Sequence, residues 1–296
     1  MKAKSNNYRG KVDISVSQNF ITSKNTIYKL IKKTNISKND FVIEIGPGKG
    51  HITEALCEKS YWVTAIELDR SLYGNLINKF KSKNNVTLIN KDFLNWKLPK
   101  KREYKVFSNI PFYITTKIIK KLLLEELNSP TDMWLVMEKG SAKRFMGIPR
   151  ESKLSLLLKT KFDIKIVHYF NREDFHPMPS VDCVLVYFKR KYKYDISKDE
   201  WNEYTSFISK SINNLRDVFT KNQIHAVIKY LGINLNNISE VSYNDWIQLF
   251  RYKQKVAGTC SRPSSRGRAS GSPSYSGGSH GRRRSPRVPR AWNASG

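Results

Sequence analysis

From Asp40 to about Lys191, short apolar runs alternate with stretches that have helical spacing. Residues 41–45 form a short apolar run that stops at the glycine-rich segment 46–50, which is typical of a buried strand before a tight turn. Helical patterns fill the gaps between such runs, most clearly at 116–127 and 152–159. The other predicted strands are residues 62–66, 86–89, 105–108, 133–137, 162–170 and 181–188. This alternation predicts an α/β fold with a doubly wound, mainly parallel seven-stranded sheet.

The pattern changes near Lys191, where the strand-like runs stop. Helical spacing at 200–212, 221–231 and 243–251 predicts a small helical domain over 191–256, after a sheet domain over 18–190. We expect residues 1–17 to form a basic N-terminal arm. No run of 18 apolar residues occurs, so neither a membrane span nor a membrane partner is predicted.

Residues 257–296 differ from the rest of the chain in composition. Arg, Ser, Gly and Pro make up 29 of these 40 residues, and Leu, Ile, Met and Phe are absent. Such a segment buries too little apolar surface to offset its ordering entropy, so we expect a disordered tail. One interpretation is an arginine-rich arm that binds RNA. The other is a fused or non-native segment with no function of its own.

Charge narrows the class of partner. The chain has 53 Lys and Arg against 25 Asp and Glu, a net charge of +28. The tail carries eight of these basic residues and no acidic one, so residues 1–256 retain a net charge of +20. A polyanion such as nucleic acid is the natural partner. Three widely spaced cysteines exclude a disulfide scaffold and favour the cytoplasm, and the scattered histidines predict no metal site.

Chemically distinct groups follow four successive predicted strands. They are the glycines at 46, 48 and 50, then Glu67, then Asp92, then Asn109. In a doubly wound sheet, ligands bind at the carboxyl ends of the strands. The glycine spacing differs from both the phosphate-binding loop and the dinucleotide fingerprint. Glycines let a ligand approach the backbone closely, although an ordinary tight turn would also explain them.

Two acidic residues favour an adenosyl ligand. Glu67 follows Gly46 by 21 residues, the spacing at which an acid can accept hydrogen bonds from ribose hydroxyls. The alternative is a solvated carboxylate at a strand end. Asp92 can accept a hydrogen bond from the amine of the ligand's adenine, although taken alone it is typical of a helix cap.

Residues 109–112, Asn-Ile-Pro-Phe, suit chemistry on the amine of a base. That amine is a poor nucleophile, because its lone pair is delocalised into the ring. If the Asn109 amide oxygen and a backbone carbonyl accepted hydrogen bonds from its two N–H groups, the lone pair would be freed. Pro111 fixes the local backbone, and Phe112 can stack on an extruded base. The alternative is that Asn109 caps the helix that follows.

With the glycine segment before it, this tetrapeptide resembles the rRNA adenine N6-dimethyltransferases. That family includes housekeeping small-subunit enzymes and the erythromycin-resistance (Erm) enzymes. The similarity runs from about Gln18 to Arg251, and residues 219–223 look like the Erm branch in particular. Further similar blocks are residues 17–22, 137–140, 142–145 and 175–182.

The resemblance implies a Rossmann-like class I methyltransferase that uses S-adenosyl-L-methionine. Asn19 and Ile21 would close over this cofactor and Gly46 would contact its methionine part. Glu67 would hold the ribose, Asp92 the adenine, and Asn109 would lie between the cofactor and the target amine. Phe112 replaces the Tyr of many relatives and would stack on the target adenine. Phe175 would cover the adenine's other face, although a buried core aromatic is an equal interpretation.

The resemblance to the Erm branch implies N6-methylation, or dimethylation, of one adenine in 23S rRNA by a monomeric enzyme. Resistance to macrolide, lincosamide and streptogramin B antibiotics would follow. The alternatives are a small-subunit 16S rRNA dimethyltransferase and a nucleic-acid-binding protein that has lost catalysis. The sequence leaves open which nucleotide is modified.

Overall fold

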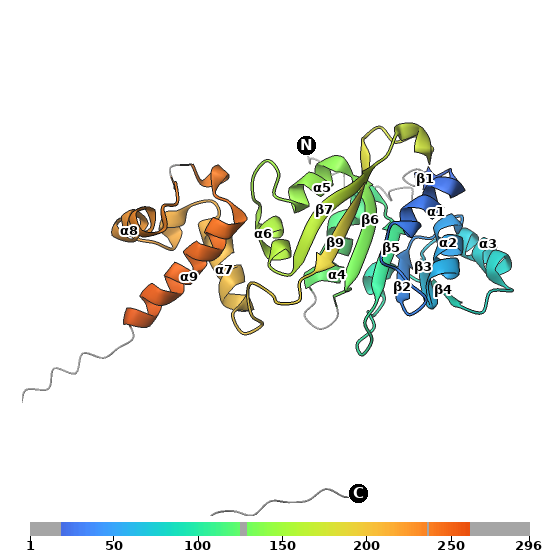
Figure 1. Ribbon diagram of the computed structural model, residues 1–296, viewed down its shortest axis with the longest axis horizontal. Helices are drawn as coiled ribbons and strands as arrows, with labels where there is room; N and C mark the ends of the chain where they lie inside the picture. Colours follow the sequence, from blue (N-terminus) through green and yellow to red (C-terminus); the bar gives the residue numbers. More distant parts are fainter. Residues whose placement is uncertain (1–18, 125–128, 236, 261–296) are drawn as a thin grey trace, which may run out of the picture.

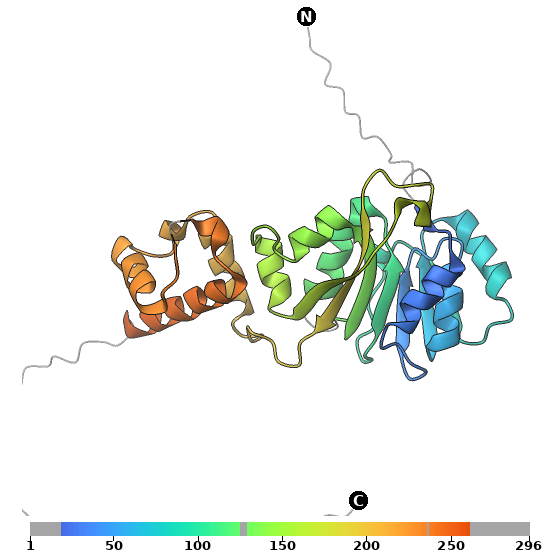
Figure 2. The same ribbon diagram turned by 45° about the horizontal axis from the view of Figure 1, so that its top comes forward.

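The computed structural model describes residues 19–124, 129–235 and 237–260. A seven-stranded sheet lies at the centre of the larger domain, and helices form a smaller domain beside it (Figures 1 and 2). Strand β9 is antiparallel to β6 and β7, and the other neighbouring pairs are parallel, which confirms the predicted fold class. In spatial order the strands are β4 (Val86–Asn90), β3 (Trp62–Glu67), β2 (Phe41–Ile45), β5 (Lys105–Asn109), β6 (Asp132–Glu138), β9 (Cys183–Arg190) and β7 (Phe162–Tyr169).

The sequence pattern placed one strand two residues too early and missed two others. The strand predicted at 181–188 is β9, which begins two residues later, at Cys183. Strands β1 (Phe20–Ile21) and β8 (Phe175–His176) were not predicted, and they pair antiparallel in a separate two-stranded sheet. A strand of two residues has no alternation that a sequence can reveal.

Successive residues of each central strand point to opposite faces, and a separate core forms on each face. On one face Leu135 packs with residues of α4 (Thr115–Leu124), α5 (Lys139–Phe145) and α6 (Lys153–Lys159). On the other face Val136 packs with residues of α1 (Lys24–Lys32) and α2 (His51–Lys59). Helix α3 (Arg70–Phe80) connects β3 to β4. Helices therefore cover both faces, as in a doubly wound fold.

The helical domain contains α7 (Trp201–Ser211), α8 (Lys221–Leu231) and α9 (Tyr243–Cys260). Its core includes Leu156 and Leu157 of α6, so the two domains share an apolar contact. Helix α9 continues nine residues beyond the predicted end at Arg251 and past the predicted domain limit at 256. Polar contacts stabilise the start of this extension: Lys253 donates to Glu203 of α7 over 2.9 Å, and Arg251, at the predicted end, pairs with Glu200, the residue before α7. Apolar periodicity cannot reveal such contacts.

Several predicted segments lie outside the described residues. They are the N-terminal arm at 1–17, residues 125–127 of the helix predicted at 116–127, and residues 261–296 of the tail. Within the described part of the chain, no helix has the length and apolar character needed to cross a bilayer.

Candidate active site

The turn between β2 and α2 has a backbone that glycine favours. Gly46, Gly48 and Gly50 have φ values of 65°, 55° and 73°, in the left-handed region that other residues rarely adopt. A Cβ atom built on Gly46 would meet no other atom within 4 Å, whereas one on Gly48 would lie 2.3 Å from the Phe20 ring. The backbone at Gly46 is therefore open to a ligand, and the backbone at Gly48 is covered.

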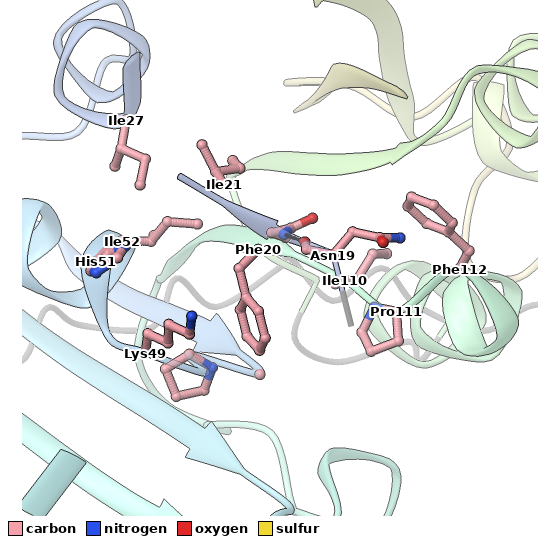
Figure 3. Close-up of a pocket in the computed structure, with 13 residues that line it drawn as sticks. Asn19, Phe20, Ile21, Ile27, Lys49, His51, Ile52, Ile110, Pro111 and Phe112 are labelled. Carbon is pink, nitrogen blue, oxygen red and sulfur yellow. Dashed lines mark hydrogen bonds between the residues drawn. The ribbon is translucent and has the colours of Figure 1, made fainter. Parts of the chain in front are cut away.

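A cavity opens beside this turn, at the carboxyl ends of β2 and β5 (Figure 3). Its free volume is about 50 Å³. Five of the predicted site residues line it together: Asn19, Ile21, Gly46, Asn109 and Phe112. Ile110 and Pro111, from the predicted tetrapeptide, also line it, and sequence reasoning missed the remaining lining residues, which are Phe20, Ile27, Pro47, Lys49, His51 and Ile52. Phe20 could have been found, because it stands between two of the predicted residues.

Glu67, at the end of β3, is not the solvated carboxylate of the alternative interpretation. Its side chain is buried, and the residue is 2% exposed. Its Oε2 accepts a hydrogen bond from Gly48 N over 3.0 Å, and its Oε1 accepts one from Asp69 N over 2.9 Å. Burial raises the pKa of the Glu67 carboxyl, although these backbone N–H groups act against the shift. Glu67 therefore ties the glycine turn to the end of β3.

Asn109, at the end of β5, does not cap the helix that follows. Its side-chain Nδ2 donates to the backbone oxygen of Asn19 over 2.6 Å, which fixes the orientation of the amide. Among the described residues no donor contacts its Oδ1. The half-buried Asn109 thus keeps an amide oxygen at the cavity, where it can accept a hydrogen bond from a ligand.

The two aromatic residues predicted for the target base differ in exposure. Phe112 is half-buried and lines the cavity. Phe175 is 3% exposed, and its ring packs edge-on against Phe170 with centroids 5.2 Å apart. In this arrangement Phe175 is the core aromatic of the alternative interpretation, and its contact with a base stays a prediction.

Asp92 has the capping role that was the alternative for it. Its carboxylate accepts hydrogen bonds from Leu94 N over 2.8 Å and Asn95 Nδ2 over 3.0 Å, at the start of the short helix η2 (Phe93–Asn95). The residue is half-buried and does not line the cavity. A role in holding adenine is untested.

The sheet order, the glycine turn and the groups at the strand ends define the class of the molecule: a Rossmann-like methyltransferase. The sequence profile of the family described as "Ribosomal RNA adenine dimethylase" matches residues 9–255. The chain belongs to this family.

Curated relatives agree with the family profile. The chain is 40% identical over 239 residues to an rRNA adenine N-6-methyltransferase of Escherichia coli, which covers 80% of this chain and 95% of the relative. It is also 40% identical over 235 residues to an rRNA adenine N-6-methyltransferase of Staphylococcus aureus, over 79% of this chain and 94% of that relative. The protein is therefore an rRNA adenine N6-methyltransferase.

Solved structures support the fold. The structure of the 23S rRNA methyltransferase ErmE aligns with a TM-score of 0.72 at 22% identity, over 80% of this chain and all of that one. A dimethyladenosine transferase from Plasmodium falciparum aligns with a TM-score of 0.65 at 22% identity, over 79% and 98%.

The cofactor of this class is S-adenosylmethionine, and the chemistry of the site fits it. An adenosyl amino acid and an amine require three kinds of group, and the site has all three: an open glycine backbone, a carboxylate at the next strand end and an amide at the target side. The free volume does not fit without rearrangement, because small-molecule sites usually hold about 300–1,000 Å³.

Proposed function

We propose that this enzyme methylates, and dimethylates, N6 of one adenine in 23S rRNA. The observation that carries the proposal is the Asn109 amide, which the Asn19 carbonyl holds with its oxygen at the cavity. An oriented acceptor beside Phe112 suits an extruded adenine whose amine must be positioned.

Residues at the target side supply orientation rather than acid–base chemistry. The Asn109 oxygen and the backbone carbonyl before Pro111 accept hydrogen bonds from the two amine N–H groups, which directs the nitrogen lone pair away from them. Phe112 stacks on the base, and Phe175 covers the other face when its segment opens. S-adenosylmethionine supplies an activated sulfonium methyl group, so alignment is the main requirement.

Residues at the cofactor side hold the cofactor by its polar ends. Gly46, Asn19 and Ile21 would contact the methionine part, and Glu67 would accept hydrogen bonds from the ribose hydroxyls. Asp92 would accept one from the adenine amine. Both acids already accept hydrogen bonds from backbone N–H groups, and their remaining lone pairs would accept from the ligand.

The large-subunit target is supported by the Erm-like segment at 219–223 and by the structural likeness to ErmE along that whole chain. A methyl group on a 23S adenine in a drug site would give resistance to macrolide, lincosamide and streptogramin B antibiotics. We further propose that the enzyme acts as a monomer in the cytoplasm on protein-free or precursor rRNA.

An interdomain groove is the proposed path for the RNA. Two adjoining cavities of about 330 and 460 Å³ share Asn213 and Ile238 and run from the start of α6 to α8. Four exposed basic side chains line them, and within the described part of the chain none of the four forms a salt bridge: Arg150, Lys153, Arg216 and Lys221. Unpaired cations in a groove suit phosphate contacts.

The groove predicts a specific salt dependence. Arg216→Ala and Lys221→Ala should each weaken RNA binding and reduce the slope of log affinity against log salt by about one. Lys81→Ala, an exposed lysine after α3, is the matched control and should leave the slope unchanged. Equal slopes for all three variants would contradict an RNA path through the groove.

The target is tested by incubating the enzyme with tritiated S-adenosylmethionine and separately purified 23S or 16S rRNA. We expect label in 23S rRNA, located by primer-extension arrest, and mass spectrometry of the nucleosides to show dimethyladenosine. Label confined to 16S rRNA would identify the small-subunit activity. Label in neither RNA, with the cofactor bound, would favour a protein that has lost catalysis.

A further inference from the structure

Phe20 has no role in the mechanism above, yet its ring lines the cavity and covers Gly48, two residues from the open Gly46 in the glycine turn. The ring edge lies 2.3 Å from the position that a Cβ atom on Gly48 would take, and Lys49 Nζ lies 5.3 Å from the ring centroid. Figure 3 shows the ring reaching from β1 toward the side of the cavity where Lys49 lies.

Two further observations show that the present arrangement leaves little room for an adenosyl ligand. The cavity has about 50 Å³ of free space, on the order of a few water molecules. Glu67, the proposed ribose acceptor, is 2% exposed and engaged by Gly48 N, the residue that Phe20 covers. The free space beside the glycine turn therefore depends on the position of Phe20, which lines the cavity and covers Gly48.

Phe20 lies in a segment whose consecutive residues contact three parts of the site. Asn19 accepts a hydrogen bond from Asn109, Phe20 covers Gly48, and Ile21 pairs with Phe175 in the β1–β8 sheet. That sheet is only two residues long, and beyond it Thr22 N donates to Asp174 O over 2.9 Å. So short a sheet can shift at modest cost.

We propose that Phe20 is a positioning residue that fills the cofactor site and must move off Gly48 before S-adenosylmethionine binds. Because the same segment holds Asn109 and pairs with Phe175, this movement couples cofactor binding to the target-base side. Cofactor binding then increases the affinity for RNA. The inference rests on the proposed function and adds an order of binding to it.

The first test is the rate at which S-adenosylhomocysteine binds, measured by stopped flow on the full chain. Phe20→Ala should increase the association rate at least threefold. Phe20→Leu keeps apolar contact with the turn, so its rate should lie between those of the wild type and Phe20→Ala. Tyr61→Ala removes an exposed ring far from the cavity and should match the wild type. An unchanged rate in Phe20→Ala, or a faster dissociation alone, would mean that Phe20 is only a wall of the bound site.

The second test is the coupling between ligands. Saturating S-adenosylhomocysteine should tighten binding of a target RNA hairpin to wild-type enzyme at least fivefold, within the usual range for coupled sites. In Phe20→Ala this factor should fall below two. A factor that persists in the variant would overturn the coupling, whereas a wild type that does not bind S-adenosylhomocysteine would contradict the proposed function instead.

Discussion

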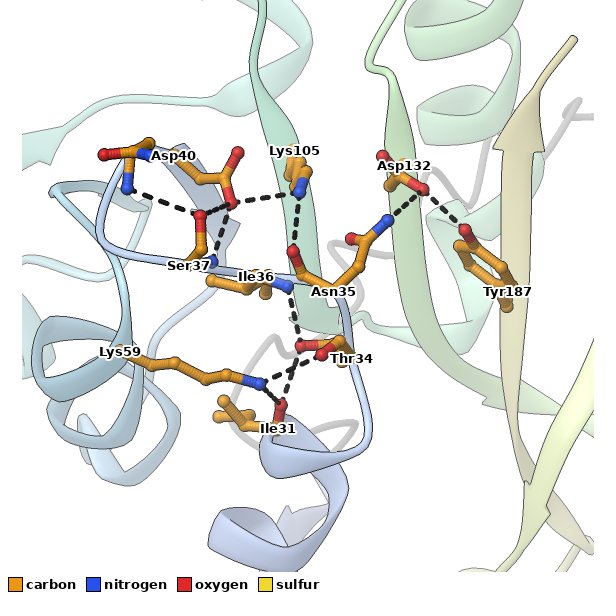
Figure 4. A network of polar contacts seen from close by, with 11 residues as sticks. Ile31, Thr34, Asn35, Ile36, Ser37, Asp40, Lys59, Lys105, Asp132 and Tyr187 are labelled. Atoms are coloured by element: carbon orange, nitrogen blue, oxygen red, sulfur yellow. Dashed lines mark hydrogen bonds and ion pairs between the residues drawn. The ribbon is translucent and has the colours of Figure 1, made fainter.

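At the amino edge of the sheet, side-chain hydrogen bonds fasten the segment between α1 and β2 to three strands (Figure 4). Asn35 Nδ2 donates to Asp132 Oδ1 over 3.0 Å, and Tyr187 donates to the same oxygen over 2.5 Å. Lys105 Nζ lies 3.0 Å from Asp40 Oδ2 and also donates to the Asn35 carbonyl over 2.8 Å. The carboxyl edge has instead a glycine turn and the two-residue β1–β8 sheet.

This difference matches the demands on the two edges. The amino-edge network spans β5, β6 and β9, so it fixes the frame from which the strand ends project. The carboxyl edge must admit a cofactor and an extruded base, and its segment around Asn19 is held by a two-residue sheet and the hydrogen bond from Asn109. Rigid support behind an adaptable site is how precise positioning and ligand entry can coexist.

The largest effect expected at the carboxyl edge comes from Asn109→Ala. Methyl transfer should fall by on the order of 10²–10³-fold, as for the loss of one preorganised hydrogen-bonding group at a reacting centre. Affinity for the cofactor should change less than tenfold, about 1.4 kcal/mol, because the glycine turn and Glu67 stay in place. Single-turnover transfer and calorimetric titration measure the two quantities. If methyl transfer by Asn109→Ala stayed within twofold of wild type, Asn109 would have no part in the reaction.

Glu67→Ala should act on cofactor binding rather than on the reacting groups. Two charge-assisted hydrogen bonds to ribose would be lost, each worth at most on the order of 1.5–3 kcal/mol because water replaces part of them. Calorimetry with S-adenosylhomocysteine should show a dissociation constant raised at least tenfold. Asp69→Ala is the matched control, since Asp69 caps α3 and does not line the cavity. An unchanged constant for Glu67→Ala would refute the assignment.

At the amino edge, Asp132→Ala should lower stability and spare the chemistry. The change removes the buried acceptor that Tyr187 and Asn35 share; because Tyr187 is half-buried and Asn35 is exposed, the expected cost is about 2 kcal/mol. Urea unfolding measures the loss, and transfer per folded molecule should stay near the wild-type rate. Asp163→Ala, an exposed acid on β7, is the control for lost charge. If Asp132→Ala were as stable as Asp163→Ala, the hydrogen bonds to Asp132 would not stabilise the amino edge.

The sequence predicts the sheet and the groups at the strand ends because both follow from local pattern. Alternating apolar runs mark the seven strands, and Asn109 and Glu67 stand at the ends of theirs. The state of those groups is not local. The burial of Glu67 depends on Gly48 N, 19 residues away, and the orientation of Asn109 depends on a carbonyl 90 residues away.

Contacts between distant segments also explain what the sequence could not show. The Phe20 ring lies on a turn that follows it by 28 residues, and nothing in the run around Phe20 marks that contact. Helix α9 extends because Lys253 meets Glu203 on another helix. Asp92 and Phe175 have structural roles that local pattern could not separate from functional ones.

The smallest effect concerns a buried acid in the strand that leads to the glycine turn. Glu44 is 1% exposed, and Thr53 donates a hydrogen bond to its Oε2 over 2.6 Å. Burial raises the pKa of Glu44 to about 8. The folded state therefore keeps a proton that the unfolded state loses above a pH of about 4.3, so Glu44 makes stability fall as the pH rises through that window to about 8.

Glu44→Gln keeps an acceptor for Thr53 but does not titrate. Between pH 6 and 7 the melting temperature of the wild type should therefore fall by a few degrees more than that of the variant, because one pH unit in this window corresponds to about 1.4 kcal/mol, or roughly 3–6 °C at this size. Other titrating groups, Glu67 included, are common to both proteins, so the difference in slope isolates Glu44. Parallel curves would mean that Glu44 is ionised in the fold and that the carboxyl edge tolerates a buried charge.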